Sequence, residues 1–300
     1  MSEQPIRSDK KTLFGAAINP PVFFGSLIVL LALISTTIII GKPVEQLFAQ
    51  AQASISDAAG WFFILLANLL MFFLIYLAFS KFGKIRLGGA EAKPDFSRIS
   101  WFSMLFSAGL GIGLLFYGVA EPILHFNYNP FVDNSNTIAA AKSAMGITFF
   151  HYGIQAWAIY ATVGLALAFF TFNLKLPLTI RSIFYPLLGD KIYGRWGDLI
   201  DVISVIATVV GLATSLGLGA QQVNAGLEYL FDISYSREIQ IVIIAVITGL
   251  ATFSLLAGLD KGIRRLSEVN MGLAILLLVF VMAIGPTAYL MDSFVQNLGY

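Results

Sequence analysis

Seven long apolar stretches constrain the fold of this chain more than any other feature of its sequence. They run approximately over residues 22–40, 61–79, 101–120, 144–170, 199–220, 239–256 and 269–290. The hydrocarbon core of a bilayer is about 30 Å thick and needs roughly 20 apolar residues per helix. Each stretch is therefore expected to cross a membrane as one helix. Charged residues make up only 12% of the chain, about half of their share in soluble domains, which supports the same interpretation.

Several classes of function are disfavoured by composition. The chain has no cysteine, so it has no disulfide, thiolate metal site or cysteine nucleophile. Its net charge of +1 provides no basic field for a nucleic-acid partner. His125 and His151 are 26 residues apart, and we expect no histidine-rich metal site from them. No catalytic pair is apparent in the spans, so an enzyme is not expected.

The positions of Lys and Arg predict the topology, because cytoplasmic loops carry an excess of both residue types. The polar tail over residues 2–11 has no obvious cleavage site, so we expect the first span to be retained. All but Lys42, Lys142 and Arg237 of the 18 Lys and Arg residues fall on one side. The N-terminus is therefore predicted to be cytoplasmic and the C-terminus to lie outside. That orientation is opposite to the usual one of seven-helix receptors.

The chain ends at Tyr300, ten residues after the last expected span. An odd number of spans with an abrupt end is unusual for a carrier and natural for a fragment. We therefore expect this chain to be the N-terminal portion of a longer protein.

The third span carries three alternate glycines near its middle, Gly109, Gly111 and Gly113. Such a cluster permits close packing of neighbouring helices. It also permits unwinding that frees backbone groups for an ion or a substrate at mid-membrane depth. The residues alone leave both outcomes open. Near the end of the span, Glu121 is expected to be an interfacial carboxylate, and His125 is expected to lie in a loop beyond a break at Pro122.

The fourth span carries an aromatic face. On a continuous helix, Tyr152, Trp157 and Tyr160 share an arc of about 140°, with Tyr160 central. Trp and Tyr usually concentrate at the membrane interfaces, whereas Trp157 and Tyr160 fall near the centre of this span. Aromatic faces bind cations, quaternary ammonium groups above all, and simple helix packing is the alternative role. His151 and Gln155 are expected to form hydrogen bonds between helices.

Polar residues in the later spans are less specific. Thr208 and the hydroxyls and glycines around it suit either ion coordination or close packing. Asp201 is expected to be solvated or paired near the cytoplasmic end of its span. The segment over residues 258–265 is expected to be a polar, turn-rich cytoplasmic loop whose charges anchor the ends of two spans.

Several separate segments together resemble the betaine/carnitine/choline transporter (BCCT) family, and the resemblance covers nearly the whole chain. The segments are residues 96–101, 106–113, 118–122, 176–180, 213–219 and 258–267. The resemblance implies an all-α, LeuT-like inverted-repeat transporter fold of twelve spans. This chain would then hold a cytoplasmic tail (1–19), two leading helices with a cytoplasmic loop (20–95) and the first five-helix repeat (96–300). The second repeat would be absent from it.

The resemblance also implies the substrate-binding residues. The aromatic residues would be Tyr152, Trp157 and Tyr160, although Tyr152 and Ala156 stand where the family usually has Trp and Pro. The hinge would consist of Gly109, Gly111 and Gly113. Choline carriers of the family tend to have Asp at the last hinge glycine. Gly113 here is similar to carriers of zwitterions such as betaine, whose carboxylate an Asp would repel.

The residues do not distinguish transport coupled to Na⁺ from transport coupled to H⁺ or from exchange of one solute for another. In sodium-driven members, backbone oxygens of the hinge, here those of Ser107 and Leu110, are expected to bind the ion. A second proposed position uses two hydroxyls four residues apart; Thr208 matches one, and Leu212 stands at the other. No other cofactor is expected.

The function implied by the resemblance is secondary import of a quaternary-ammonium osmolyte across the bacterial inner membrane by alternating access. Glycine betaine is the substrate that the resemblance favours most, and choline and carnitine are the next candidates. A homotrimer is compatible with the family. The alternatives are a LeuT-like carrier of neutral amino acids and a non-transporting receptor or scaffold.

Overall fold

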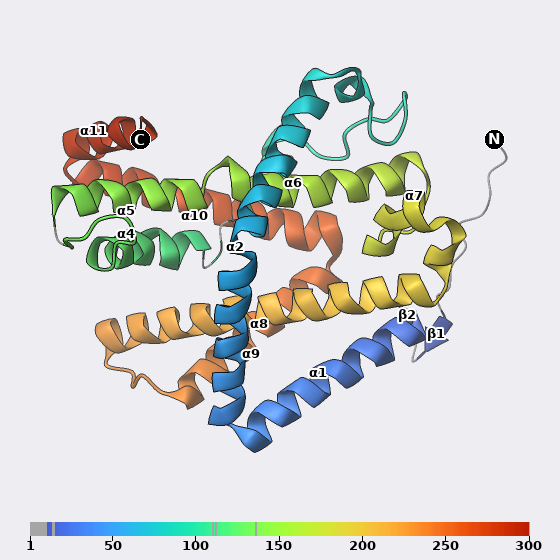
Figure 1. Cartoon of the computed structure of the whole chain (residues 1–300), viewed down its shortest axis with the longest axis horizontal. Helices are drawn as coiled ribbons and strands as arrows, with labels where there is room; N and C mark the ends of the chain where they lie inside the picture. Colours follow the sequence, from blue (N-terminus) through green and yellow to red (C-terminus); the bar gives the residue numbers. More distant parts are fainter. Residues whose placement is uncertain (1–10, 14–15, 110, 112, 136, 300) are drawn as a thin grey trace. The chain divides into compact units, whose positions relative to one another are not determined.

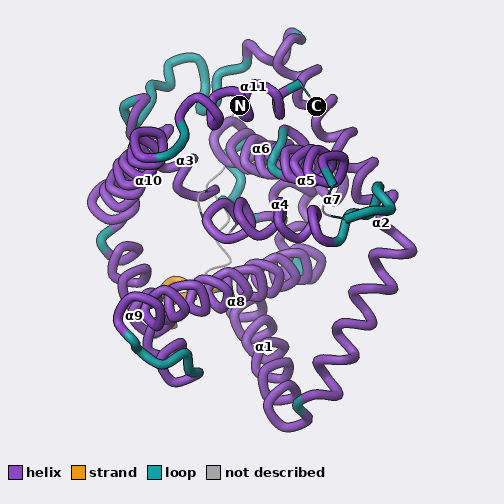
Figure 2. The backbone as a smooth tube through the Cα atoms, turned by 90° about the vertical axis from the view of Figure 1, so that its left-hand side faces the viewer, coloured by secondary structure: helices purple, strands orange, loops and turns teal. Residues whose placement is uncertain are grey.

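The computed structural model describes residues 11–13, 16–109, 111, 113–135 and 137–299, and nearly all of them are helical (Figures 1 and 2). Within these residues, six helices are long and apolar enough to cross a membrane. A bent pair of helices brings the number to seven if it is counted as one span. The prediction of an all-α membrane protein is therefore confirmed. The LeuT-like arrangement and the division at residues 19 and 95 stay predictions.

The chain forms two compact units. Unit 1 comprises residues 1–92 and 153–211, and unit 2 comprises residues 93–152 and 212–300. The elements of unit 1 are β1 (Lys11–Leu13), β2 (Ala16–Ile18), α1 (Pro20–Ile40), α2 (Lys42–Phe79), η1 (Lys81–Lys84), α6 (Ile154–Ala168), η3 (Phe169–Asn173), η4 (Ile180–Phe184), α7 (Tyr185–Leu188), η5 (Gly189–Tyr193) and the first part of α8 (Arg195–Phe231).

Unit 2 contains the remainder of α8 and the broken third span. Its other elements are α3 (Arg98–Gly109), η2 (Gly113–Tyr117), α4 (Gly118–Asn127), α5 (Ile138–His151), α9 (Arg237–Leu256), η6 (Leu259–Ile263), α10 (Arg264–Ile284) and α11 (Thr287–Leu298).

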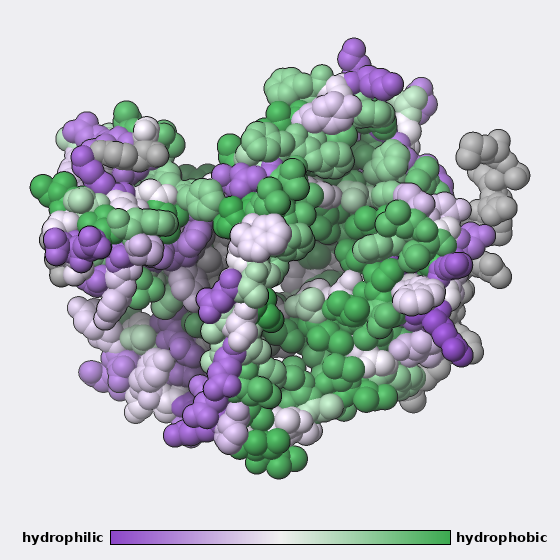
Figure 3. Space-filling model, viewed as in Figure 1, coloured by the Kyte–Doolittle hydropathy of each residue, from purple (hydrophilic) through white to green (hydrophobic). Residues whose placement is uncertain are grey.

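Helices α1 and α2 differ from the expected spans in an informative way. The two helices meet at a sharp turn at Gly41, whose positive φ of 70° suits glycine (Figure 1). The expected apolar span over residues 61–79 is the second half of α2, whereas the helix itself begins at Lys42. Figure 3 shows polar residues along the first half of α2 and apolar residues over α1. Hydropathy therefore located the apolar half of α2 and missed its polar extension.

Three further differences concern the N-terminal tail, the expected loop over residues 258–265 and the end of the last span. The N-terminal tail contains the antiparallel pair β1–β2, with Lys11 opposite Ile18. The expected loop over residues 258–265 is mostly helical, because the π-helix η6 begins at Leu259 and continues directly into α10. The last span ends at Ile284 rather than near residue 290, since Gly285 and Pro286 separate it from α11.

Many of the buried side chains are small, and many large apolar side chains face outward. Ala140, Ala144 and Ser103 are buried, whereas Phe79 is 90% exposed and Ile39 is 81% exposed. Membrane helices associate through close contacts of small residues and leave large apolar residues to the lipid. The pattern is therefore that of a bundle that is solvated by acyl chains.

A polar seam joins α3 to α10 in unit 2. Ser100 Oγ donates to Glu268 Oε1 at 2.6 Å. Ser107 Oγ donates to the carbonyl oxygen of Ser267 at 3.1 Å and accepts from Asn270 Nδ2 at 3.2 Å. These bonds hold the first half of the broken span against α10.

A buried ion-pair network organises unit 1. Arg181 donates from its backbone nitrogen to Asp201 Oδ1 (3.0 Å) and from Nε to Asp201 Oδ2 (2.6 Å). Its other side-chain nitrogens donate to Asp198 Oδ1 (2.8 Å) and to the carbonyl oxygen of Ile192 (3.1 Å), and Asn19 Nδ2 also donates to Asp198 (3.2 Å). Burial opposes the charge of Arg181, yet bonds to both carboxylates raise the pKa of its guanidinium above its usual value. The prediction that Asp201 is a solvated or paired carboxylate is confirmed in its paired form.

We expect Gly262→Ala to destabilise the protein by about 1–3 kcal/mol, the usual cost of overpacking. Gly262 lies on η6, where an added Cβ would overlap the carbonyl oxygen of Ser254 at the end of α9. The measurement is thermal unfolding in detergent, with Gly272→Ala on α10 as the control. No heavy atom lies within 4 Å of a Cβ at Gly272. Equal melting temperatures for the two variants would contradict the close crossing of α9 and η6.

Candidate functional site

The third span is broken at the glycine cluster. Helices α3 and η2–α4 are bent by 64° at this point. Gly109 ends α3, Gly111 lies in the break and Gly113 begins the π-helix η2. Leu110, also a predicted ion-binding residue, lies outside the described residues, as does Ile112. Of the two outcomes left open by the glycines, the interrupted helix is therefore the one found. A break of this kind releases backbone groups from the regular hydrogen bonds of a helix, and groups so released can bind a ligand in transporters.

Tyr152 contacts this break directly. Its hydroxyl donates to the carbonyl oxygen of Gly113 at 2.6 Å. A Cβ at Gly113 would lie 3.8 Å from Tyr152 Cε1, which is ordinary van der Waals contact. Two of the predicted substrate-binding residues, far apart in sequence, are thus brought together in unit 2.

We expect Tyr152→Phe to loosen the hinge, because it removes the hydrogen bond to the carbonyl oxygen of Gly113, which is worth about 0.5–1.5 kcal/mol. Amide hydrogen exchange in peptides covering residues 113–120 should then be up to about tenfold faster. The control is Tyr128→Phe, since Tyr128 is 80% exposed in the same unit. Unchanged exchange in Tyr152→Phe would show that the hydroxyl does not hold the hinge.

The fourth span is also interrupted, and one prediction about it is wrong. Helix α5 ends at His151, and α6 begins only at Ile154. Tyr152 and Gly153 are non-helical between them, so a single helical wheel does not relate Tyr152 to the later rings. Trp157 and Tyr160 do share one helix and one face, with ring centroids 6.1 Å apart and planes at 83°. The predicted arc therefore holds for that pair only.

The predicted substrate residues thus form two local groups. The Trp157–Tyr160 pair belongs to unit 1, while Tyr152 and the hinge glycines belong to unit 2. Trp157 is 40% exposed and Tyr160 is 48% exposed, so ring surface is accessible on α6. A quaternary ammonium group favours such faces.

The predicted ion-binding residues are similarly divided. The side chain of Ser107 is bonded to α10 in unit 2, as described above. Thr208 lies on α8 in unit 1, and its hydroxyl donates to the carbonyl oxygen of Ser204 at 2.8 Å. The role of these residues in binding an ion stays a prediction.

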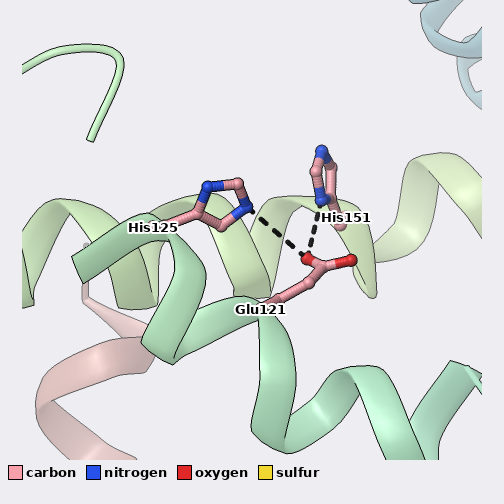
Figure 4. A group of neighbouring side chains, drawn as sticks. All are labelled: Glu121, His125 and His151. Carbon is pink, nitrogen blue, oxygen red and sulfur yellow. Dashed lines mark hydrogen bonds and ion pairs between the residues drawn. The ribbon is translucent and has the colours of Figure 1, made fainter. Parts of the chain in front are cut away.

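Glu121, His125 and His151 form a cluster that the sequence interpretation missed (Figure 4). Glu121 Oε2 lies 2.8 Å from His151 Nδ1 and 3.9 Å from His125 Nε2. The expected break at Pro122 is wrong, because α4 continues through Pro122 to Asn127. Both α4 residues therefore share one helix face. The expected hydrogen bond of His151 between helices is confirmed. The 26 residues between His125 and His151 argue against a shared site, yet the two rings lie close together in the fold.

A groove of about 410 Å³ lies beside the break in unit 2. Leu115 and Val119 line one wall, and Gln222 and Tyr235 line the other. Gln222 Nε2 donates to the carbonyl oxygen of Leu115 at 3.3 Å, which uses one of the backbone groups near the break. The groove is mainly apolar and carries few polar groups.

Comparison with known proteins resolves the family. A model of the betaine/carnitine/choline family transporters (BCCT) matches residues 21–300. The chain belongs to this family. Curated BCCT relatives include a glycine betaine transporter of Acinetobacter baylyi, 43% identical over 95% of this chain and 43% of its own length. Another is the glycine betaine transporter OpuD of Bacillus subtilis, 48% identical over 85% of this chain and 50% of its own length. The family and these relatives are transporters and not enzymes.

Other BCCT relatives differ in the substrates that their names state. The glycine betaine/proline/choline transporter VP1723 of Vibrio parahaemolyticus is 42% identical over 95% of this chain and 54% of its own length. The high-affinity choline transport protein of Escherichia coli is 42% identical over 94% of this chain and 42% of its own length. The chain thus spans about half the length of the BCCT relatives it matches.

Proposed function

We propose that the complete protein containing this chain imports a quaternary-ammonium osmolyte, with glycine betaine as the leading substrate. Family membership and the named substrates of the relatives support this proposal. The broken third span carries it most directly, since a discontinuous membrane helix is how secondary transporters build a site at mid-membrane depth.

The chain's own residues suggest how the substrate is held. Trp157 faces the trimethylammonium group, and Tyr152 and Tyr160 line the same site when the transporter is assembled. Aromatic faces attract this cation without burying a formal charge of the protein. Gly109, Gly111 and Gly113 allow backbone and substrate to approach closely, because they carry no side chains. Alternating access then exposes the site to the two sides of the membrane in turn.

Gly113 is proposed to favour a zwitterion over a cation. We expect Gly113→Asp to reduce uptake of betaine by about tenfold, equivalent to about 1.4 kcal/mol, and to raise uptake of choline relative to betaine. The new carboxylate would repel the carboxylate of betaine and attract the uncompensated charge of choline. Gly113→Asn is the matched control for size, and initial uptake rates of both labelled solutes are the measurement. The same change of preference in Gly113→Asn would rule out a charge effect.

Coupling to Na⁺ or H⁺ belongs to the same proposal. Backbone oxygens at Ser107 and Leu110 and the hydroxyl of Thr208 are the proposed ion ligands of this chain. Leu212 offers no oxygen from its side chain, so a second ion position of the hydroxyl-pair type is incomplete here.

The proposed setting is the bacterial inner membrane, with a cytoplasmic N-terminus. The distribution of Lys and Arg supports this orientation. A LeuT-like fold, with this chain supplying two leading helices and the first repeat, and assembly into a homotrimer are further parts of the proposal.

The test is uptake of labelled betaine, choline and carnitine by cells expressing the complete protein, with and without Na⁺. Uptake of at least one of these solutes above the level of the vector control supports the proposal. Competition with neutral amino acids separates the alternative carrier, which would be inhibited by amino acids and not by betaine. Binding of betaine without uptake would instead support a receptor or scaffold.

A further inference from the structure

Three potential metal ligands converge between α4 and α5 of unit 2, outside the proposed substrate residues (Figure 4). Glu121 and His125 are four residues apart on α4, so they point from one helix face. His151 is the last residue of α5. One ligand atom from each of the three side chains lies within 4.8 Å of the other two. The group contains both histidines of the chain.

The distances suit a small cation. Ligand atoms of a tetrahedral zinc site, with metal bonds near 2.1 Å, lie about 3.4 Å apart. The observed separations of Glu121 Oε2 from His151 Nδ1 and His125 Nε2, 2.8 and 3.9 Å, fall on either side of that value. The two imidazole rings have centroids 5.9 Å apart, with planes at 63°. Coordination therefore requires side-chain rotations that shorten the 3.9 Å separation and lengthen the 2.8 Å one.

The supporting helices are firmly placed, and the cluster is open on one side. Helices α4 and α5 lie side by side (Figures 1 and 2). The side chains of Glu121 and His125 are only 18% and 23% exposed, whereas that of His151 is 49% exposed. A hydrated cation can reach the cluster through the His151 side.

We propose that Glu121, His125 and His151 bind a divalent transition-metal ion, with Zn²⁺ as the best fit. Two imidazoles and one carboxylate form a His₂Glu ligand set that zinc accepts with a water in the open position. Mg²⁺ and Ca²⁺ prefer oxygen ligands, so two imidazoles disfavour them. In the bound form the metal takes the place of the His151–Glu121 hydrogen bond. Neutral His151 binds through the lone pair of Nδ1 with its one proton on Nε2, and Glu121 binds as a carboxylate through Oε2.

The bound metal would stiffen the region next to the hinge. Tyr152, which follows His151 directly, donates its hydroxyl to the carbonyl of Gly113. A metal that ties the end of α5 to α4 therefore also restrains the segment that carries Tyr152. This inference is independent of the proposed transport function, because metal binding is measured without uptake.

The experiment measures metal binding to the complete protein, purified in detergent without a histidine tag and stripped of metal with a chelator. Isothermal titration with Zn²⁺ should give one site per chain that is at least tenfold weaker in Glu121→Gln, His125→Gln and His151→Gln. Co²⁺ should give the visible absorption of a four-coordinate site, abolished by added Zn²⁺. Glu228→Gln, which changes an exposed carboxylate on α8 of the same unit, should bind as the unchanged protein does.

A rescue variant separates metal coordination from a purely structural hydrogen bond. His151→Cys supplies a thiolate, which zinc accepts, and it introduces a cysteine into a chain that has none. It should retain Zn²⁺ binding where His151→Gln loses it, and its Co²⁺ spectrum should gain a thiolate charge-transfer band. Equal Zn²⁺ affinity in the unchanged protein and all three Gln variants would overturn the proposal, as would the absence of saturable binding in the unchanged protein.

Discussion

Replacing Asp201 with Ala is expected to destabilise the protein by about 3–5 kcal/mol. The change removes one of the two carboxylates that pair with the buried guanidinium of Arg181, and breaking a buried ion pair by removing one partner is costly. Arg181 is 4% exposed and Asp201 is 8% exposed. Arg181 Nε and the Arg181 backbone nitrogen both donate to this carboxylate, so two donors lose their acceptor at once.

The measurement is thermal unfolding of the purified protein in detergent, and the loss of monodispersity on heating is used to detect unfolding. Asp57→Ala on α2 is the control, because Asp57 is an exposed carboxylate in the same unit. Arg181→Lys should also lower the melting temperature, since an ammonium group cannot reproduce the planar set of donors of the guanidinium. A double replacement, Arg181→Met with Asp201→Leu, should recover part of the loss, because it removes both charges. A melting temperature for Asp201→Ala equal to that of Asp57→Ala would contradict the network.

Trp157→Ala is expected to have the largest effect on function. A cation–π contact in a desolvated site contributes about 2 kcal/mol, equivalent to about 30-fold in affinity. The loss should appear mainly as a higher KM for betaine, because the ring binds the substrate and takes part in no bond change. Loss of the edge-to-face contact with Tyr160 should add to the effect.

The matched control is Trp61→Ala, which removes the same residue type from the 68% exposed position on α2. Trp157→Phe keeps a π-face and should retain more affinity than Trp157→Ala. The measurement is the concentration dependence of betaine uptake, normalised to the amount of protein in the membrane. An unchanged KM in Trp157→Ala would remove Trp157 from the substrate site.

The spans and the hinge could be predicted from the sequence because each depends on local composition. Apolar runs locate membrane helices, as the second half of α2 shows, since the bilayer selects for hydropathy directly. Gly109, Gly111 and Gly113 indicated a weak point in the third span for an equally local reason. The choice between packing and unwinding needed the structure, because it depends on neighbouring elements.

The errors arose where tertiary structure overrides local rules. Pro122 was expected to end its helix, yet α4 continues past it, just after the π-helix η2. Local π-helical adjustment is one way in which membrane helices tolerate proline. That error hid the relation of Glu121 to His125, although their spacing of four residues was the available signal. The contact with His151 depends on how α5 packs on α4, and no spacing rule in the sequence predicts it.

The central claim, transport of a quaternary-ammonium solute, is tested most directly by solute counterflow. The complete protein is reconstituted into liposomes loaded with unlabelled betaine, and entry of labelled betaine is followed. The account predicts transient accumulation of label that choline or carnitine inside the vesicles also supports, and that is strongly reduced in Trp157→Ala. Absence of counterflow with every onium solute, together with counterflow of a neutral amino acid by the same preparation, would contradict it.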